Sequence, residues 1–394
     1  MLPLLIISNL CRVSVASKGG CHISPPRVWA PQVSICAFAA GVFTGGGGLK
    51  NQLEKVAIGV NTTCLASDNS GSETNGQGAV AMLGQAQSLP KVVILLCTYH
   101  GQYYLADQLE SFTAQIHSNW DVWASDDGSK DDTHAILESY QRKWSADRLS
   151  IHFGPSEGFA VNFLSLTYKA GIEAEYYAYS DQDDIWESDH LSRALNWLKT
   201  VPPDIPALYS SRTRYMSEDG SDQGFSALFN KPPSFCNALV QNIAGANTMV
   251  FNQAARLLLT KTPSQLNIVS HDWWVYMLVS GCGGRVFYDS YPGVRYRQHD
   301  NNIVGQNMTV LVRLQRLKGL LAGRLKNWNE INLNALNEMS PFLTDENRDV
   351  LSLFGKARCG SVFSRVYNLY HSGVYRQTLA GNIGLLFAAI LRKL

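Results

Sequence analysis

Strand-like and helix-like segments alternate along the chain from Lys91, and this pattern limits the fold more than any other feature of the sequence. Residues 92–97 form a continuous apolar run, which is typical of a strand buried on both faces. Apolar residues then recur at spacings of four, three and four, namely Leu105, Leu109, Phe112 and Ile116. This spacing predicts a helix with one face packed on the strand. The alternation favours an α/β fold with a parallel, doubly wound sheet.

The alternation continues beyond this first pair. Further strands are expected over residues 120–124, 149–153, 176–180 and 207–211. One helix, with Asp132 as its N-cap, is expected after the first of these strands, and another over residues 158–170 after the second. After residue 211 the pattern is less regular, with candidate strands at 246–251 and 285–288, a helix opening at 271–274 and a helical segment from 306. We therefore expect a mixed, mainly parallel sheet flanked by helices, followed by a helical C-terminal extension.

An acidic stretch directly follows the strand expected over residues 176–179. Its residues are Tyr179, Ser180, Asp181, Gln182, Asp183, Asp184, Ile185 and Trp186. Three carboxylates this close repel one another and lose water, a cost that a divalent metal ion carrying a phosphorylated ligand would offset. The alternative is a solvated acidic loop that caps the helix beginning near Ser188. An EF-hand calcium loop is excluded, because Ile185 and Trp186 stand where an oxygen ligand and glycine are required.

Other polar residues also follow predicted strands. They are Thr98 and Tyr99 after the first strand, and Asp126 and Asp127 after the second. In an open α/β sheet, ligands bind beyond the carboxyl ends of the strands. The fold would therefore bring these residues and the acidic stretch into one crevice.

The composition is that of a globular protein: 394 residues, 45% hydrophobic and 16% charged, with a formal net charge of +1. A net charge this small argues against a general nucleic-acid-binding protein. The cysteines form no CxxC pair, which favours a reduced, cytoplasmic chain without a disulfide framework or a zinc site. The apolar opening of residues 1–7 is too short to span a bilayer and lacks the basic segment of a signal peptide.

Three regions are expected along the chain. Residues 1–90 include a Gly-rich run and a Ser/Gly/Asn-rich run and are expected to be a disordered or non-native segment. On the second hypothesis translation begins at Met82, and residues 1–81 are not part of the native protein. Residues 91–305 form the α/β domain, and residues 306–394 the helical extension. No acidic residue follows Asp349, whereas six basic residues do. The apolar segment 379–391 is consistent with an interfacial membrane helix or an ordinary core helix, so a membrane surface is one candidate partner.

Five short motifs follow one another along the chain: Cys97-Thr98-Tyr99-His100-Gly101, Ser125-Asp126-Asp127-Gly128-Ser129, the acidic stretch 179–186, His271-Asp272-Trp273-Trp274 and Tyr296-Arg297-Gln298-His299. In this order they resemble the motifs of the inverting glycosyltransferases of family 2. The likeness covers residues 91–305 and is greatest to the group known as rhamnosyltransferases. It implies a GT-A (Rossmann-like) fold and a nucleoside-diphosphate sugar donor, with rhamnose favoured as the sugar. It also implies a divalent metal ion, Mg²⁺ or Mn²⁺, and a glycan or lipid-linked acceptor in cell-surface polysaccharide synthesis.

The resemblance gives roles to individual residues. Donor-binding positions are Thr98 and Tyr99 beside the base, Asp126 as acceptor of a hydrogen bond from the base imide, its neighbour Asp127, and Asp181 near the ribose. Asp183 and His299 match positions that face the metal or the diphosphate, and Arg297 would add positive charge there. For Arg297 and His299, the alternative to a functional role is an ordinary surface ion pair or a core histidine.

Asp272 is the candidate general base. It lies at the start of an apolar helix beside Trp273 and Trp274, and the loss of water there would raise its pKa and make it a better base. The opposing interpretation is a structural N-cap, since the N-terminus of a helix stabilises an anion.

Two departures from the family pattern affect the interpretation. His100 stands where asparagine is common, and the QxxRW motif of processive synthases is absent, which favours transfer of one sugar per acceptor encounter.

Two other functions stay open. A metal-dependent sugar-phosphate nucleotidyltransferase would use a similar crevice but usually carries a basic phosphate loop, and residues 98–102 contain no Lys or Arg. A non-catalytic, sugar-binding membrane adaptor gives no reason for the carboxylates.

Overall fold

A computed structural model describes residues 88–263, 265–299 and 323–394 of the chain. Its centre is a nine-stranded sheet with the order β3-β2-β1-β4-β8-β6-β9-β5, and β7 pairs with β6 outside this path. Strands β3, β2, β1, β4, β6 and β9 run in one direction, and β8, β7 and β5 run against them. The predicted mixed, mainly parallel α/β sheet is therefore confirmed.

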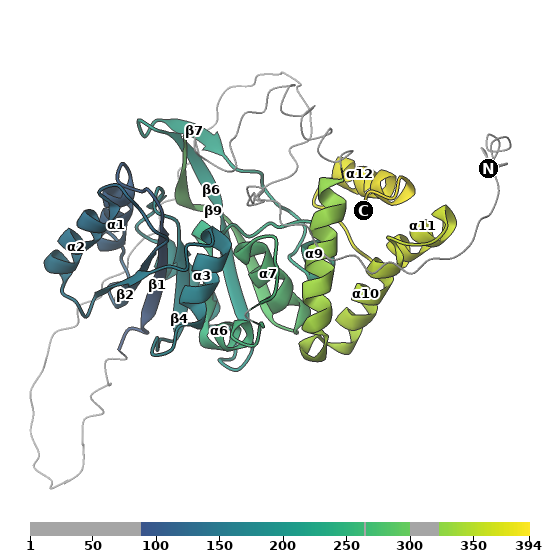
Figure 1. The fold of residues 1–394 in the computed structure, drawn as a ribbon, viewed down its shortest axis with the longest axis horizontal. Helices are drawn as coiled ribbons and strands as arrows, with labels where there is room; N and C mark the ends of the chain where they lie inside the picture. Colours follow the sequence, from purple (N-terminus) through teal and green to yellow (C-terminus); the bar gives the residue numbers. More distant parts are fainter. Residues whose placement is uncertain (1–87, 264, 300–322) are drawn as a thin grey trace, which may run out of the picture. The chain divides into compact units, whose positions relative to one another are not determined.

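The N-terminal half of the domain is built from βα units (Figure 1). In chain order, the elements are β1 (Val92–Thr98), α1 (Leu105–Thr113), β2 (Trp120–Asp126), α2 (Thr133–Trp144), β3 (Leu149–Phe153), α3 (Phe159–Tyr168), β4 (Tyr176–Ser180), β5 (Ile185–Trp186) and α4 (His190–Leu198). The parallel register pairs Thr98 with Asp126 and Leu96 with Ser180. The carboxyl ends of β1, β2 and β4 therefore meet at one edge, as their sequence predicts.

Alternate residues of β1 belong to two different hydrophobic clusters. Val92, Ile94 and Leu96 pack with apolar residues of α1, α2 and α4. Residues 93, 95 and 97 pack with apolar residues of α3, α6 and α7 on the opposite face. Because both faces of the strand are covered, its sequence is apolar throughout instead of alternating.

The second half of the domain is less regular. Its elements are β6 (Ala207–Ser217), β7 (Asp222–Phe225), α5 (Phe235–Ala238), η1 (Ala246–Thr248), β8 (Val250–Asn252), α6 (Gln253–Leu259), α7 (His271–Gly281) and β9 (Arg285–Gln298). The long pairing of β6 with β9, from Ala207–Arg285 to Ser217–Gln298, brings the end of β9 to the sheet edge that carries the acidic stretch.

Helices follow the sheet in the C-terminal part of the chain. They are α9 (Arg324–Glu338), η2 (Ser340–Phe342), α10 (Asp345–Lys356), α11 (Val362–His371) and α12 (Leu379–Ile390), drawn in yellow-green to yellow in Figure 1. Their buried residues, such as Leu336, Phe354 and Leu385, share one hydrophobic cluster with Trp273 of α7. Polar contacts add to this packing, since Asn237 Nδ2 donates to the Tyr375 carbonyl at 3.0 Å. Within the described ranges, no helix is long and apolar enough to cross a bilayer.

Some sequence predictions were wrong in detail. Ile116 does not share the buried face of α1, since it lies beyond the end of the helix and is 68% exposed. Asp132 occupies the N-cap position of α2 without a side-chain cap, and Asp131 Oδ1 instead accepts from the amide of Thr133 at 3.2 Å. Residues 246–248 form a 3-10 turn ahead of a shorter strand. The predictions for residues 1–87 and 300–322 lie outside the described residues.

Candidate active site

The acidic stretch runs from the end of β4 through β5, and its carboxylates lie between the two strands at the carboxyl edge of the sheet. Asp184 is fully buried, and Asp181 and Asp183 are half-buried. Asp184 has a structural role: its Oδ2 accepts from Asn247 Nδ2 at 2.6 Å and its Oδ1 from the Arg297 amide at 3.2 Å. These contacts hold Asp184 inward, and Asp181 and Asp183 are the more exposed carboxylates of the stretch.

Gln182 joins the acidic stretch to the loop after β1. Its Oε1 accepts from the amide of Tyr99 at 2.8 Å, and its Nε2 donates to the carbonyl of the same residue at 2.9 Å. The side-chain amide therefore pairs with both main-chain groups of Tyr99, as a neighbouring strand would. Gly101 allows this approach, because a Cβ at that position would lie 2.4 Å from Gln182 Oε1. Sequence analysis missed the role of Gln182, although this residue stands between Asp181 and Asp183.

His100 occupies the left-handed region of backbone conformation, with a φ of 53°. Asparagine adopts this conformation more readily than most residues do, which explains why asparagine suits the position. His100 is held there because its amide donates to Ser129 Oγ at 2.9 Å.

Asp126 closes the turn after β2 with its carboxylate. Its Oδ1 accepts from the hydroxyls of Thr98 at 2.9 Å and Ser129 at 2.5 Å, and its Oδ2 accepts from the Ser129 amide at 2.9 Å. Since a carboxylate offers about four acceptor positions, one remains for a ligand donor. The geometry is compatible with the predicted contact between Asp126 and a base, which stays a prediction.

Asp127 holds the loop between β3 and α3. Its Oδ1 accepts from the amide of Ser156 at 2.7 Å, and its Oδ2 accepts from the amide of Gly158 at 2.9 Å. Each oxygen therefore has a main-chain donor in this loop. This gives Asp127 a structural role beside the predicted contact with the donor.

Arg297, the penultimate residue of β9, forms hydrogen bonds with three separate segments of the chain. Its side chain donates to the Asp183 carbonyl at 3.1 Å, to the Glu218 carbonyl at 2.9 Å and to Asp107 Oδ2 at 2.8 Å. The residue is only 3% exposed. The guanidinium also lies over the ring of Tyr104, 4.6 Å from its centroid. Its direct contacts are thus within the protein, and it acts on the acidic stretch through the Asp183 main chain.

His299 lies directly against Asp183. Its Nε2 is 2.9 Å from Asp183 Oδ2, and its ring stacks on Tyr104 with centroids 5.3 Å apart. Within the described residues, no cluster of three metal-binding side chains exists. A carboxylate suits Mg²⁺ or Mn²⁺ if phosphate oxygens complete the coordination, whereas an imidazole is a more usual ligand of softer metal ions. The donor set therefore fits a metal that arrives with a phosphorylated ligand.

Asp272 is 1% exposed and lies in the first turn of α7. The N-cap position is Ser270, so Asp272 is not itself the cap residue. Its Oδ1 accepts from the Trp273 amide at 2.8 Å and its Oδ2 from Asn242 Nδ2 at 2.8 Å. Burial raises the pKa of Asp272, and these hydrogen bonds act in the opposite direction.

Asp272 acts electrostatically on Asp181 of the acidic stretch. Burial, followed by the negative charges of Asp183 and Asp272, raises the pKa of Asp181 to about 8. Such an effect requires the three carboxylates to be near one another. The fold therefore brings together side chains from the end of β4 and the start of α7, as the motifs predict.

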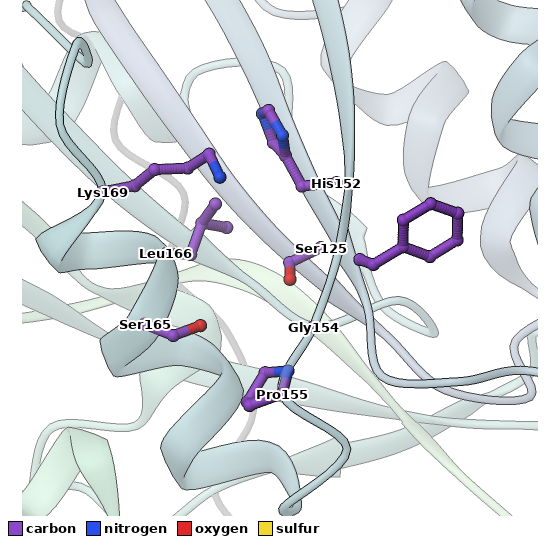
Figure 2. Close-up of a pocket in the computed structure, with 8 residues that line it drawn as sticks. Ser125, His152, Gly154, Pro155, Ser165, Leu166 and Lys169 are labelled. Carbon is purple, nitrogen blue, oxygen red and sulfur yellow. The ribbon is translucent and has the colours of Figure 1, made fainter.

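A separate cavity of about 270 Å³ lies between β3 and α3 (Figure 2). Its lining includes His152 and Gly154 from the strand side and Ser165 and Lys169 from the helix side. Ser125, which precedes Asp126 in the sequence, also lines this cavity. No residue of the acidic stretch lines the cavity. The carboxylate cluster thus lies at the strand ends and outside this cavity.

Comparison with known proteins identifies the domain. Residues 93–241 match the family described as "Glycosyl transferase family 2". The chain carries a family 2 glycosyltransferase domain. This confirms the predicted family and the predicted enzyme class. The match contains the motifs at 97–101, 125–129 and 179–186 and ends before Asp272.

Relatives of known sequence include other glycosyltransferases. The dTDP-rhamnosyl transferase RfbG of Shigella flexneri is 27% identical over 233 residues, which cover 56% of this chain and 78% of the relative. The putative teichuronic acid biosynthesis glycosyltransferase TuaG of Bacillus subtilis is 28% identical over 110 residues, or 28% of this chain and 42% of the relative.

Solved structures with partial similarity include two transferases. S. aureus TarS 1-349 in complex with UDP-GlcNAc has a TM-score of 0.48 at 14% identity, covering 77% of this chain and 88% of that chain. The mannosyltransferase PcManGT from Pyrobaculum calidifontis, in complex with GDP-Man and Mn²⁺, has a TM-score of 0.43 at 15% identity. The match covers 78% of this chain and 86% of that chain.

Proposed function

We propose that this glycosyltransferase moves a sugar, with rhamnose favoured, from a nucleoside-diphosphate sugar to a glycan or lipid-linked acceptor in cell-surface polysaccharide synthesis. The proposal is supported by the family match, which contains the acidic stretch, and by the negative charges of Asp183 and Asp272, which together with burial raise the pKa of Asp181. A carboxylate whose pKa is raised by burial and by neighbouring carboxylates is typical of a functional site.

The donor would lie along the carboxyl ends of β1, β2 and β4. Thr98, Tyr99 and Asp126 would border the base, and Asp181 the ribose. The proposed base contact is supported by the acceptor position left on Asp126 and by the loop that Gln182 fixes through Tyr99. Rhamnose is supported by the similarity to RfbG, a dTDP-rhamnosyl transferase, at 27% identity.

A divalent metal ion would be held by Asp183 and His299, whose Oδ2 and Nε2 lie 2.9 Å apart. When bound, it would neutralise the negative charge that the diphosphate gains as it leaves. Arg297 would keep Asp183 in place, since its Nε donates to the carbonyl of that residue. With two protein ligands, binding of the metal and of the diphosphate should depend on each other.

Asp272 would act as the general base. The acceptor hydroxyl gives its proton to the carboxylate of Asp272 while its oxygen bonds to the anomeric carbon. The bond from that carbon to the diphosphate breaks, and the nucleoside diphosphate leaves with the electron pair. The raised pKa of Asp272 supports this role, because a base is more effective when its pKa approaches the working pH. Asn242 would orient the carboxylate through its 2.8 Å hydrogen bond.

We further propose that the domain comprises residues 91–305, that residues 306–394 form a C-terminal extension, and that transfer takes place in the cytoplasm at the inner face of the membrane. The absence of disulfides among the described cysteines, such as Cys236 and Cys282, is compatible with this compartment. A lipid-linked acceptor would be reached at that surface.

Nucleoside-diphosphate release tests the activity. Purified protein is incubated with dTDP-rhamnose and a membrane extract as acceptor source, with Mg²⁺, Mn²⁺ or EDTA. We expect release that requires both acceptor and metal. Release of pyrophosphate instead would indicate a nucleotidyltransferase, and binding of sugar without release of either product would indicate an adaptor; either result would contradict the proposal.

A further inference from the structure

Exposed apolar side chains are concentrated on the outer faces of α11 and α12. On α11 they are Phe363, Tyr367 and Tyr370, and on α12 Ile383, Phe387 and Ile390. Both sets have spacings of four and three residues, which places each set on one face of its helix. Phe363 is 87% exposed and Phe387 55% exposed. Single exposed apolar residues are ordinary, but a row of them on each of two helices that pack together is typical of an interaction surface.

The two helices are fixed in place, so this exposure does not come from loose packing. The opposite faces contribute Leu369 and Leu385 to the main hydrophobic cluster. The buried guanidinium of Arg365 on α11 donates to the carbonyls of Ala389 at 2.7 Å and Ile390 at 2.9 Å on α12. These bonds satisfy carbonyls at the C-terminal end of α12, which have no partner within the helix. The apolar face therefore belongs to a rigid pair of helices.

Positive charge borders this face at the C-terminal end of α12. Arg392 is exposed and Lys393 half-buried, and Lys356 is exposed at the end of α10. Arg358 Nε donates to the carbonyl of Leu394 at 3.1 Å, which brings the end of α10 to the end of the chain. No acidic residue follows Asp349, so α11 and α12 carry no acidic side chain, and Arg358 pairs with Glu330 of α9 at 3.5 Å.

We infer that the outer faces of α11 and α12 form a docking surface for an anionic membrane. Apolar and aromatic side chains beside exposed Lys and Arg are the pattern of helices that lie in the bilayer interface. A second copy of the chain is a poorer occupant, because its identical face offers no acidic side chain to these positive charges. The inference goes beyond sugar transfer and stands without it.

Vesicle flotation of the full-length protein tests the surface. Vesicles contain phosphatidylglycerol and phosphatidylcholine, or phosphatidylcholine alone, with no donor or acceptor present. The variant Phe363→Ser/Phe387→Ser should lower partition into the anionic vesicles by about tenfold or more. Arg392→Gln/Lys393→Gln should lower it by a similar factor on anionic vesicles and little on neutral ones. The control Leu257→Ser alters an exposed apolar residue of α6 and should leave partition unchanged.

The outcomes separate the alternatives. Thermal melting shows whether each variant folds, and sedimentation shows its oligomeric state. Equal flotation of the wild type and Phe363→Ser/Phe387→Ser would overturn the inference, as would failure of the wild type to float. Self-association that the double variant abolishes, without any vesicle binding, would assign the face to a second copy instead. Sugar transfer is not measured, so failure of the proposed activity leaves this test unaffected.

Discussion

Asp183 has the most specific role at the residue scale, since it pairs with His299 and is proposed to hold the metal. Asp183→Ala should abolish metal-dependent binding of the nucleoside diphosphate while the protein stays folded, because His299 alone supplies one ligand. Calorimetric titration with and without Mn²⁺ measures this. The matched control Asp204→Ala removes an exposed carboxylate away from the site and should bind normally. Unchanged binding by Asp183→Ala would refute the metal assignment.

Gln182 is predicted to position the donor through Tyr99. Gln182→Glu removes the N–H group that donates to the Tyr99 carbonyl and sets a carboxylate oxygen against it. We expect the KM for the donor to rise about tenfold, the effect of one lost hydrogen bond, with a smaller change in kcat.

Gly101→Ala provides an independent test of the same contact. Its Cβ would lie 2.4 Å from Gln182 Oε1 and would force the side chain away from Tyr99. The two variants should therefore raise the donor KM to a similar extent. A normal KM in both would show that the Gln182 contact does not influence donor binding.

At the scale of elements, two arginines of β9 offer a matched comparison. Arg297 is buried and donates to three segments, whereas Arg295 forms a partly exposed ion pair with Glu187 at 2.8 Å. Arg297→Met should lower the free energy of unfolding by about 2–4 kcal/mol, because three segments lose their hydrogen bonds to one buried, charged donor. Arg295→Met should cost less than about 1 kcal/mol. Urea denaturation measures the free energy of unfolding of both variants. Equal losses would contradict the claim that Arg297 stabilises the contacts among these three segments.

Local patterns predicted the βα elements and their order, because strand and helix periodicity is encoded by adjacent residues. They did not predict which contacts each polar side chain makes. The partners of Arg297 at Asp107 and Glu218 are 190 and 79 positions away along the chain. Sequence alone therefore suggested a diphosphate contact for this arginine, whereas the structure shows three protein acceptors. The pairing of Gln182 with Tyr99 spans 83 positions and was missed for the same reason.

Stability against acid is a property of the whole molecule to which His190 contributes. Burial lowers the pKa of His190 to about 3, with Asp289 acting against this, and neither ring nitrogen has a hydrogen-bond partner within the described residues. The unfolded chain binds a proton at His190 below about pH 6.5, and the native protein does not. This group therefore lowers the free energy of unfolding by up to about 1.4 kcal/mol for each pH unit below that value.

His190→Met removes this term and leaves the other titrating groups in place. Measured by urea denaturation at pH 7 and pH 5.5, the variant should gain stability relative to the wild type by about 1–2 kcal/mol as the pH falls. The variant must be compared with the wild type, because other groups also change the free energy of unfolding with pH. The raised pKa values of Asp181 and Asp184 increase this free energy as the pH falls, which is opposite to the effect of His190. The same pH dependence in both proteins would show that His190 titrates normally in the native state.

The central claim for the whole molecule is that Asp272 removes the proton from the acceptor. Asp272→Asn tests it, since the amide nearly preserves the shape of the side chain and cannot accept the proton. Asn242 Nδ2 now donates to Asp272 Oδ2, so an amide nitrogen there would face a second donor. We therefore expect a stability loss of about 1–3 kcal/mol in a variant that still folds.

The decisive measurement is nucleoside-diphosphate release by Asp272→Asn with saturating donor, metal and acceptor, at a temperature where melting shows the variant to be folded. Turnover should fall on the order of a hundredfold or more, while the affinity for the nucleoside diphosphate stays within about twofold of the wild type. Turnover at a near-native rate would contradict the account, because Asp272 would then have only a structural role in α7 and another group would have to serve as the base.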